Sequence, residues 1–379
     1  MNIAILTLPL HANYGGIIQN YALQTVLRRM GHSVDTINLR STPLGKKYDI
    51  PLLKMFSGLG GRSRAKQNVR RFMDEHISFT TPLRTKKELC RYDFSAYDAV
   101  IVGSDQVWRA CYAYPDIYAY YLDFIRDGRI RKIAYSASFG TDTQEYTPEQ
   151  AMRCGECIRD FDVITVREQS ALTLINDVYQ WHCKSAPVQT LDPTMLLHSE
   201  DYVQLASGYG NDDGNRGGLF YYVLDMTEEK RDLINRTAAA LGVKPFTVNR
   251  KSRRWYDSLE KRMVPPVEEW LMAFDKARYV FTDSFHGSVF SIIFNKDFVA
   301  FGNKKRGMGR FRSLMDKFQL GGRLVYMAQE FSPELFCRGI DWDAVNSIRE
   351  AERELSLACL ERGLQAPNSE MTSPKALRK

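Results

Sequence analysis

The chain has 379 residues, of which 44% are hydrophobic and 26% are charged, with a formal net charge of +7. This composition is typical of a globular protein with apolar material for two cores, and it excludes general disorder. No stretch is long and apolar enough to span a bilayer, and the N-terminus lacks the features of a secretory signal. Seven scattered cysteines form no disulfide framework, so we expect a cytoplasmic protein.

Apolar runs alternate with amphipathic helical stretches, which is the pattern of βαβ units and mostly parallel sheets. In the first half, the sequence predicts strands at 3–8, 33–39, 99–102, 132–136, 163–166 and 188–191, and a first helix over 16–30 that Gly31 ends. In the second half, it predicts strands at 219–224, 245–248, 279–282 and 298–301, and helices over 228–241, 267–276 and 285–294.

We therefore predict an α/β fold with two doubly wound Rossmann-like domains, 1–197 and 198–340, that face a central cleft. A closing helix over 341–364 and a disordered tail over 365–379 complete the chain. A glycine-rich stretch over 209–218 lies just past the domain boundary, and turn chemistry explains its Asp212 and Asp213 better than metal binding does.

The segment Thr282-Asp283-Ser284-Phe285-His286-Gly287 joins a predicted strand to a helix. Asp283 or Ser284 can cap this helix, and its free N–H groups favour an anion. His286 adds a further hydrogen-bond donor, and Gly287 lets a ligand approach the backbone. We predict an anion site centred on His286; the alternative is that His286 merely caps or packs.

Other strand ends should reach the same cleft, because ligands of doubly wound sheets bind at the carboxyl ends of the strands. Arg167 follows one strand and suits a carboxylate or phosphate. The stretch 303–312 follows another strand and is predicted to be a flexible cationic clamp or a solvated loop; its cations include Lys304, Lys305, Arg310 and Arg312. Amide, aromatic and polar side chains that suit a sugar lie at Asn13, Tyr14, Gln19, Asn20, Asp105 and Ser138.

Three weaker signals have plain structural alternatives. The segment 43–71 carries eight basic residues against one aspartate, so it could touch an anionic membrane surface or simply be solvated. Cys154 and Cys157 lie in a predicted helix without a second cysteine pair, so a zinc site is not expected. The pair Gly15-Gly16 lacks the spacing of a dinucleotide-binding fingerprint, and no nucleic-acid-binding signature is present.

Five short motifs follow one another from the first loop to the second domain: Asn13-Tyr14-Gly15-Gly16, Val102-Gly103-Ser104-Asp105-Gln106-Val107-Trp108, Val166-Arg167-Glu168, Leu191-Asp192-Pro193-Thr194 and Thr282-Asp283-Ser284-Phe285-His286-Gly287. Together they resemble the polysaccharide pyruvyl transferase family. The resemblance implies a fold like that of the GT-B glycosyltransferases and transfer of a pyruvyl group from phosphoenolpyruvate onto a sugar, as in bacterial exopolysaccharide or capsule biosynthesis.

The resemblance also implies that Arg167, His286 and either Lys304 or Lys305 bind phosphoenolpyruvate. We expect the second domain to hold this donor and the first to hold a sugar or lipid-linked acceptor. His286 and Arg167 would bind phosphate and carboxylate, and Asp105 and Asp283 are candidate bases. This chemistry requires no cofactor or metal. The alternatives are a nucleotide-sugar glycosyltransferase of the same architecture and a non-catalytic anion- or glycan-binding relative.

Overall fold

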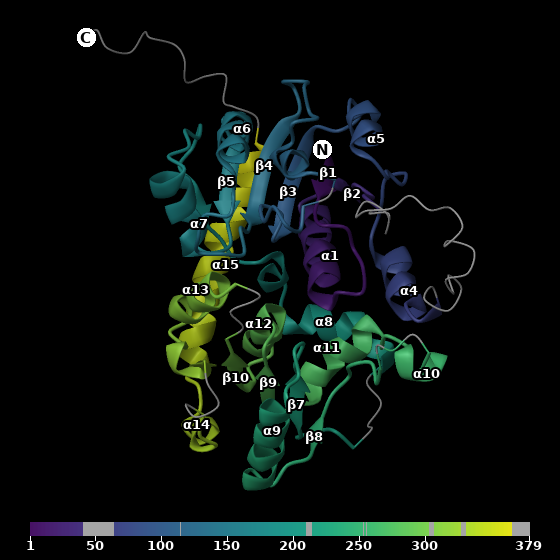
Figure 1. The fold of residues 1–379 in the computed structure, drawn as a ribbon, viewed down its shortest axis with the longest axis vertical. Helices are drawn as coiled ribbons and strands as arrows, with labels where there is room; N and C mark the ends of the chain where they lie inside the picture. Colours follow the sequence, from purple (N-terminus) through teal and green to yellow (C-terminus); the bar gives the residue numbers. More distant parts are fainter. Residues whose placement is uncertain are drawn as a thin grey trace.

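The structure is a computed structural model that describes residues 1–40, 64–113, 115–209, 214–252, 254, 256–302, 307–326 and 331–365. It contains two parallel sheets, one in the upper and one in the lower half of Figure 1. The first has the strand order β2-β1-β3-β4-β5-β6 and the second the order β11-β10-β9-β7-β8. The α/β fold with two doubly wound halves is as predicted.

The first sheet consists of β1 (Asn2–Leu6), β2 (Ser33–Thr36), β3 (Ala99–Asp105), β4 (Arg131–Ala137), β5 (Val163–Val166) and β6 (Val188–Gln189). The second consists of β7 (Leu219–Tyr222), β8 (Pro245–Phe246), β9 (Tyr279–Thr282), β10 (Asp297–Phe301) and β11 (Leu324–Val325). Every residue of β3, β5 and β9 is buried, which explains why these strands appear in the sequence as short continuous apolar runs. Strand β11 has only two residues and was not predicted from the sequence.

The longer helices are α1 (Tyr14–Arg29), α4 (Gln67–His76), α6 (Pro148–Ile158), α9 (Glu228–Ala240), α11 (Val267–Lys276), α12 (Phe285–Ile293), α13 (Gly309–Lys317) and α15 (Trp342–Leu364). Shorter helices are α5 (Lys86–Arg91), α7 (Gln169–Thr173), α8 (Ser199–Leu205), α10 (Leu259–Arg262) and α14 (Glu334–Cys337). The 3₁₀ turn η3 (Pro193–Leu196) follows β6. Gly31 has a φ of +85° after α1, which is the conformation expected of a glycine that ends a helix.

Two predicted segments differ from the structure or lie partly outside it. The expected clamp over 303–312 is not all loop, because Arg310 and Arg312 belong to the first turn of α13. Lys304 and Lys305 lie outside the described residues, as do Asp212, Asp213 and positions 366–379 of the predicted tail. Of the basic segment 43–71, the structure describes only residues 64–71, where α4 begins.

The two halves pack against each other through apolar side chains. One apolar cluster extends from Ile17 of α1 to Phe290 of α12 without a break. Within it the ring of Tyr14 stacks on that of Trp270, with a centroid separation of 5.4 Å. The hydroxyl of Tyr14 also donates to the carbonyl oxygen of Pro265 over 2.8 Å. The first turn of α1 is therefore anchored to the second half.

Helix α15 lies along both halves, on one side of the molecule (Figure 1). In the second half, Arg349 donates to the carbonyl oxygen of Ile293 over 3.1 Å. In the first half, the Ser356 hydroxyl accepts from the backbone N–H of Leu191 over 3.0 Å, and Arg131 donates to the carbonyl oxygen of Gly363 over 2.7 Å. The predicted closing helix thus contacts both domains. No helix among the described residues is long and apolar enough to cross a membrane.

Candidate functional site

A cleft of about 710 Å³ lies between the carboxyl ends of the two sheets. The first half contributes the start of α1 and the end of β3, and the second half contributes the starts of α12 and α13 with the loop after β8. The predicted residues that line the cleft are Asn13, Tyr14, Asp105, Asp283, Ser284, His286 and Arg310. Residues not singled out from the sequence also line it, among them Arg231, Asn249, Arg250, Lys251 and Phe285.

Helix α12 begins at the floor of this cleft. Ser284 has extended backbone angles, and its hydroxyl accepts a hydrogen bond from the backbone N–H of Gly287 over 3.4 Å, so Ser284 is the cap of the two candidates, Asp283 and Ser284, that the sequence offered. A Cβ at Gly287 would lie 2.1 Å from Oγ1 of Thr282, so the missing side chain leaves room for this threonine.

Arg167 lies between two carboxylates at the end of β5. Its Nη1 is 2.8 Å from Oδ2 of Asp192, and its Nη2 is 3.3 Å from Oδ1 of Asp105. The arginine side chain is only 2% exposed, so these charges are held out of water. Burial acts to lower the pKa of Arg167, but the nearby carboxylates, Asp192 first, outweigh burial and raise it. The guanidinium is therefore a fixed positive charge.

Arg167 and a second arginine, Arg310, both lie against the aromatic ring of Phe285. The guanidinium carbons of Arg167 and Arg310 are 4.5 Å and 5.3 Å from the centroid of Phe285. A cation over an aromatic face is attracted by the ring quadrupole, so Phe285 helps to hold two like charges together. Burial, followed by the charge of Arg167, lowers the pKa of Arg310 to about 10. Arg310 stays positive at neutral pH and lines the cleft, where it can meet an anion.

His286 projects from α12 into the first half of the molecule. Its Nε2 is 3.6 Å from Oδ2 of Asp192, and a Cβ built on Gly15 would lie 2.1 Å from its Nδ1. The imidazole ring therefore occupies the space that a side chain at Gly15 would need. Gly15 and His286 are 271 positions apart in sequence, so this contact depends on the arrangement of the two halves.

This contact leads to a first prediction. Gly15→Ala should lower the free energy of unfolding by about 1–3 kcal/mol, because the added methyl group overpacks the interface between the halves and pushes His286 aside. Gly15 is helical, so the substitution brings no backbone strain of its own. Thermal and urea unfolding would measure the effect. Gly128→Ala is the control, since a Cβ there meets nothing within 4 Å; equal stability of both variants would contradict the contact.

Asp105 completes the cluster at the end of β3. Burial acts to raise its pKa, but the charges of Arg167, His286 and Arg310 outweigh burial and keep the pKa below the ordinary value of 3.8. Its backbone has a φ of +79°, which is uncommon for a residue other than glycine. An ionised carboxylate thus lines the cleft beside three basic side chains.

Several predicted site residues use their polar groups in hydrogen bonds within the fold. Both carboxylate oxygens of Asp283 accept from the loop after β7, from the N–H groups of Leu224 and Asp225 over 2.6 and 3.1 Å, and Nζ of Lys230 lies 2.7 Å from Oδ2. Asp283 is fully buried in this network, so it is a poor candidate for a base. The sequence could place Asp283 at the strand end but could not show which way it points.

Three predicted sugar-binding residues are also structural. Gln19 is buried, donates to Oγ1 of Thr7 over 3.0 Å and accepts from the N–H of Ser104 over 3.1 Å. Asn20 is buried, and its side-chain oxygen accepts from the hydroxyl of Thr36 over 2.9 Å. The Ser138 hydroxyl donates to Glu168 over 2.9 Å. None of the three residues lines the described cleft, and their hydrogen bonds instead connect strands and loops within the first domain.

The two arginines of α13 separate, because residues two positions apart on a helix point in different directions. Arg310 is buried in the cluster, whereas the side chain of Arg312 is 54% exposed and lies 3.5 Å from Asp142. Asp192 was part of a recognised motif but was not predicted as a site residue, although it too follows a predicted strand. The strand-end rule that selected Arg167 would also have selected Asp192.

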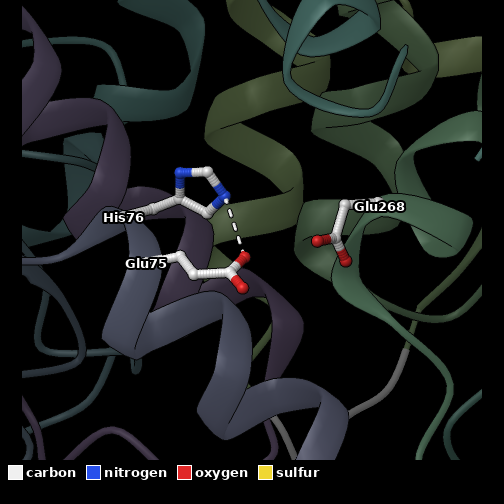
Figure 2. A group of neighbouring side chains, drawn as sticks. All are labelled: Glu75, His76 and Glu268. Carbon is white, nitrogen blue, oxygen red and sulfur yellow. Dashed lines mark ion pairs between the residues drawn. The ribbon is translucent and has the colours of Figure 1, made fainter. Parts of the chain in front are cut away.

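A separate group of side chains away from the cleft could hold a metal ion. Glu75 and His76 of α4 face Glu268 of α11, and their ligand atoms lie within 4.8 Å of one another (Figure 2). Arg71 already lies among them, with nitrogens 2.6 Å from Glu268 and 3.4 Å from Glu75. The guanidinium therefore already compensates both carboxylates.

Comparison with known proteins identifies the family of this chain and supports its type of fold. Residues 13–305 match the family model described as "Polysaccharide pyruvyl transferase". No curated protein matches the chain. The Arabidopsis thaliana protein UGT89C1, complexed with UDP-L-rhamnose, superposes with a TM-score of 0.51 at 10% identity, over 95% of this chain and 99% of that one. UDP-N-acetylglucosamine 2-epimerase from Rickettsia bellii superposes with a TM-score of 0.50 at 9% identity, over 96% of each chain. At these identities the likeness shows the GT-B type of fold alone.

Proposed function

Because the chain belongs to the polysaccharide pyruvyl transferase family, we propose that it transfers a pyruvyl group from phosphoenolpyruvate onto a sugar of a glycan precursor. The product would be a cyclic pyruvate ketal, with release of phosphate. One observation carries the proposal: His286 and Arg310 line the cleft at the start of α12, and the buried Arg167, which does not itself line the cleft, shares the ring of Phe285 with Arg310. A compact, multiply charged anion needs several cations and a helix N-terminus to offset its loss of water.

In the proposed reaction, the terminal enol carbon of phosphoenolpyruvate takes up a proton, and its C2 becomes cationic. A sugar hydroxyl then adds to C2 while a base accepts the hydroxyl proton. A second hydroxyl of the same sugar displaces phosphate and closes the ketal. This sequence balances without a metal or a redox cofactor. Arg310, which lines the cleft, and the N-terminus of α12 are the groups that would receive the phosphate or carboxylate.

Asp105 and His286 would move the protons. Asp105 lines the cleft as an ionised carboxylate, so it can accept the proton of the attacking hydroxyl. His286 lines the same cleft and would pass a proton to the leaving phosphate. Lys304 or Lys305 would add a cation, as the family resemblance implies; both lie outside the described residues.

The acceptor would enter from the side of the cleft formed by Asn13 and Asn249, whose amides suit sugar hydroxyls, whereas the ring of Tyr14 is already stacked on Trp270. We propose a precursor of a surface polysaccharide, made in the cytoplasm and carried on a lipid or as a free sugar. The basic segment 43–71 would then contact the membrane surface.

Phosphoenolpyruvate should raise the thermal unfolding midpoint of the protein, whereas UDP-sugars should not, because a ligand that binds only the folded state stabilises it.

Arg310→Gln should weaken phosphoenolpyruvate binding about 10- to 100-fold, since hydrogen bonds to charged groups contribute about 1.5–3 kcal/mol each. Arg312→Gln, two positions away and exposed, is the matched control. Titration calorimetry measures both variants.

Product analysis then separates the enzymatic alternatives. Pyruvyl transfer releases inorganic phosphate and leaves an acid-labile ketal on the sugar, whereas glycosyl transfer releases a nucleotide. Stabilisation by a nucleotide sugar in place of phosphoenolpyruvate would overturn the proposed function.

A further inference from the structure

Asp192 is a buried carboxylate that links the predicted functional residues of the two domains. It follows β6 in the first domain, and its side chain is 1% exposed. Its Oδ2 lies 2.8 Å from Nη1 of Arg167, in the same domain, and 3.6 Å from Nε2 of His286, in the other domain. One oxygen atom thus faces both basic side chains that we place at the site.

The other oxygen of Asp192 fixes the position of the group. Oδ1 accepts from the backbone N–H of Thr194 over 3.1 Å and from its hydroxyl over 2.7 Å. The carbonyl oxygen of Thr194 in turn accepts from the hydroxyl of Tyr202 over 2.8 Å. Since these bonds hold η3 and the carboxylate together, Oδ2 has a fixed direction, in which it accepts from Arg167 and, over 3.4 Å, from the hydroxyl of Ser104.

The ring of His286 has two different environments. Nε2 is buried and faces Asp192, whereas Nδ1 lies against Gly15, and the residue as a whole lines the cleft. A carboxylate beside Nε2 favours the tautomer that carries its proton on Nε2. Nδ1 is then the nitrogen that can accept a proton from, or return one to, a molecule in the cleft.

The Nε2 to Oδ2 distance of 3.6 Å is longer than a hydrogen bond, and Nε2 has no other hydrogen-bond partner among the described residues. A shift of about half an ångström between the domains would make the bond, and hydrogen bonds of catalytic groups commonly tighten when substrate binds. The buried nitrogen is therefore placed to gain its partner on ligand binding.

We propose that Asp192 is a positioning residue that accepts a hydrogen bond from Nε2 of His286 when phosphoenolpyruvate binds, and so makes Nδ1 the proton-transferring atom. The inference rests on the proposed function for the reaction, but the contact between Asp192 and His286 does not depend on it. Asp192 touches no substrate; it acts through His286 and, by the same oxygen, through Arg167.

The kinetic test uses Asp192→Asn, which keeps the shape and the bonds from Thr194 but removes the charge. We expect kcat to fall at least about 100-fold while the KM for phosphoenolpyruvate changes by less than roughly threefold. Asp201→Asn is the control, because Asp201 also pairs with an arginine, at 2.6 Å from Arg29, but lies outside the cleft. Its kcat should equal that of the wild type.

Two other results would overturn the inference. A negative charge beside an anionic substrate repels it, so a variant with tighter phosphoenolpyruvate binding and unchanged kcat would show that Asp192 only neutralises Arg167. A variant with lower thermal stability but wild-type kcat in its folded fraction would show a purely structural role. In both cases wild-type turnover would still support the proposed function.

The second measurement needs no turnover. Nitrogen-15 NMR of labelled histidine reports the tautomer of each of the six histidines, and the His286→Gln variant assigns the signal. We expect the Nε2–H tautomer for His286 at a pH where its ring is neutral, in a larger fraction when phosphoenolpyruvate is added. The Nδ1–H tautomer would refute the contact. If phosphoenolpyruvate does not bind but the Nε2–H fraction of His286 in the free protein falls in the Asp192→Asn variant, the proposed function fails and the contact stands.

Discussion

Replacing Arg167 with methionine should lower the free energy of unfolding by about 3–5 kcal/mol. The guanidinium is the direct partner of two carboxylates, Asp105 and Asp192, whose side chains are 10% and 1% exposed. Without it, both charges remain buried, and a buried charge without compensation is among the most costly features a fold can contain. Urea unfolding at pH 7, followed by circular dichroism, would measure the loss.

The effect should depend on pH with a definite sign. Burial acts to raise the pKa of Asp105 and of Asp192, but the attraction of Arg167 and His286 outweighs it, and both pKa values lie below the ordinary 3.8. A depressed pKa contributes stability that is present above the ordinary value and is lost as the pH falls below it. The stability difference between wild type and variant should therefore shrink below about pH 4.

The control for this substitution is Arg129→Met. Arg129 pairs with Asp127 at 2.6 Å, a distance similar to that of the Arg167 pair with Asp192, but its side chain is 85% exposed. An exposed pair is screened by water, so this variant should unfold like the wild type. If the two variants lost equal stability, the cost would come from removing any arginine and not from the buried carboxylates.

Replacing His286 with glutamine should reduce turnover of phosphoenolpyruvate by about 10²- to 10⁴-fold, the range typical of a lost general acid or base. Glutamine preserves the polarity and much of the volume of the ring but cannot exchange a proton. The affinity for phosphoenolpyruvate should fall much less, because Arg310 and the N-terminus of α12 remain. Phosphate release under saturating phosphoenolpyruvate measures the first quantity and calorimetry the second.

His182→Gln provides the comparison, since His182 is exposed and lies outside the cleft. It should leave both turnover and affinity unchanged. Unaltered turnover in the His286 variant would exclude proton transfer by this histidine, and a large loss of affinity with unaltered turnover would make it a binding group only.

The sequence predicted the alternation of strands and helices well, because the buried strands are continuous apolar runs and several helices, among them α6, α9 and α12, begin with a side-chain cap. Ser284 is an example: a serine between a β strand and an apolar helix is a local signal, and the structure shows the capping bond. The positions of Arg167 and His286 just beyond strand ends could be predicted in the same way, since the carboxyl end of a parallel strand is a local property with a known spatial consequence.

Side-chain direction could not be predicted in this way. Asp283 and His286 are three residues apart, yet their side chains point in different directions. The carboxylate of Asp283 accepts hydrogen bonds from the loop after β7, whereas the ring of His286 packs against Gly15 of the first domain. Gln19 and Asn20 follow a motif that suits a sugar, but their amides bond to neighbouring strands and loops. Such outcomes depend on contacts between residues far apart in sequence, for which a single sequence contains no local pattern.

The continuous helix α15 limits how far the cleft can open. It is attached to the second domain through Arg349 and to the first through Ser356 and Gly363, within one rigid rod of 23 residues. A wide hinge motion would have to bend this rod or break its bonds at one end. Movements of a fraction of an ångström are still possible. We therefore expect substrates to enter and leave through the opening of the cleft, and we do not expect a slow domain movement to limit the rate of turnover.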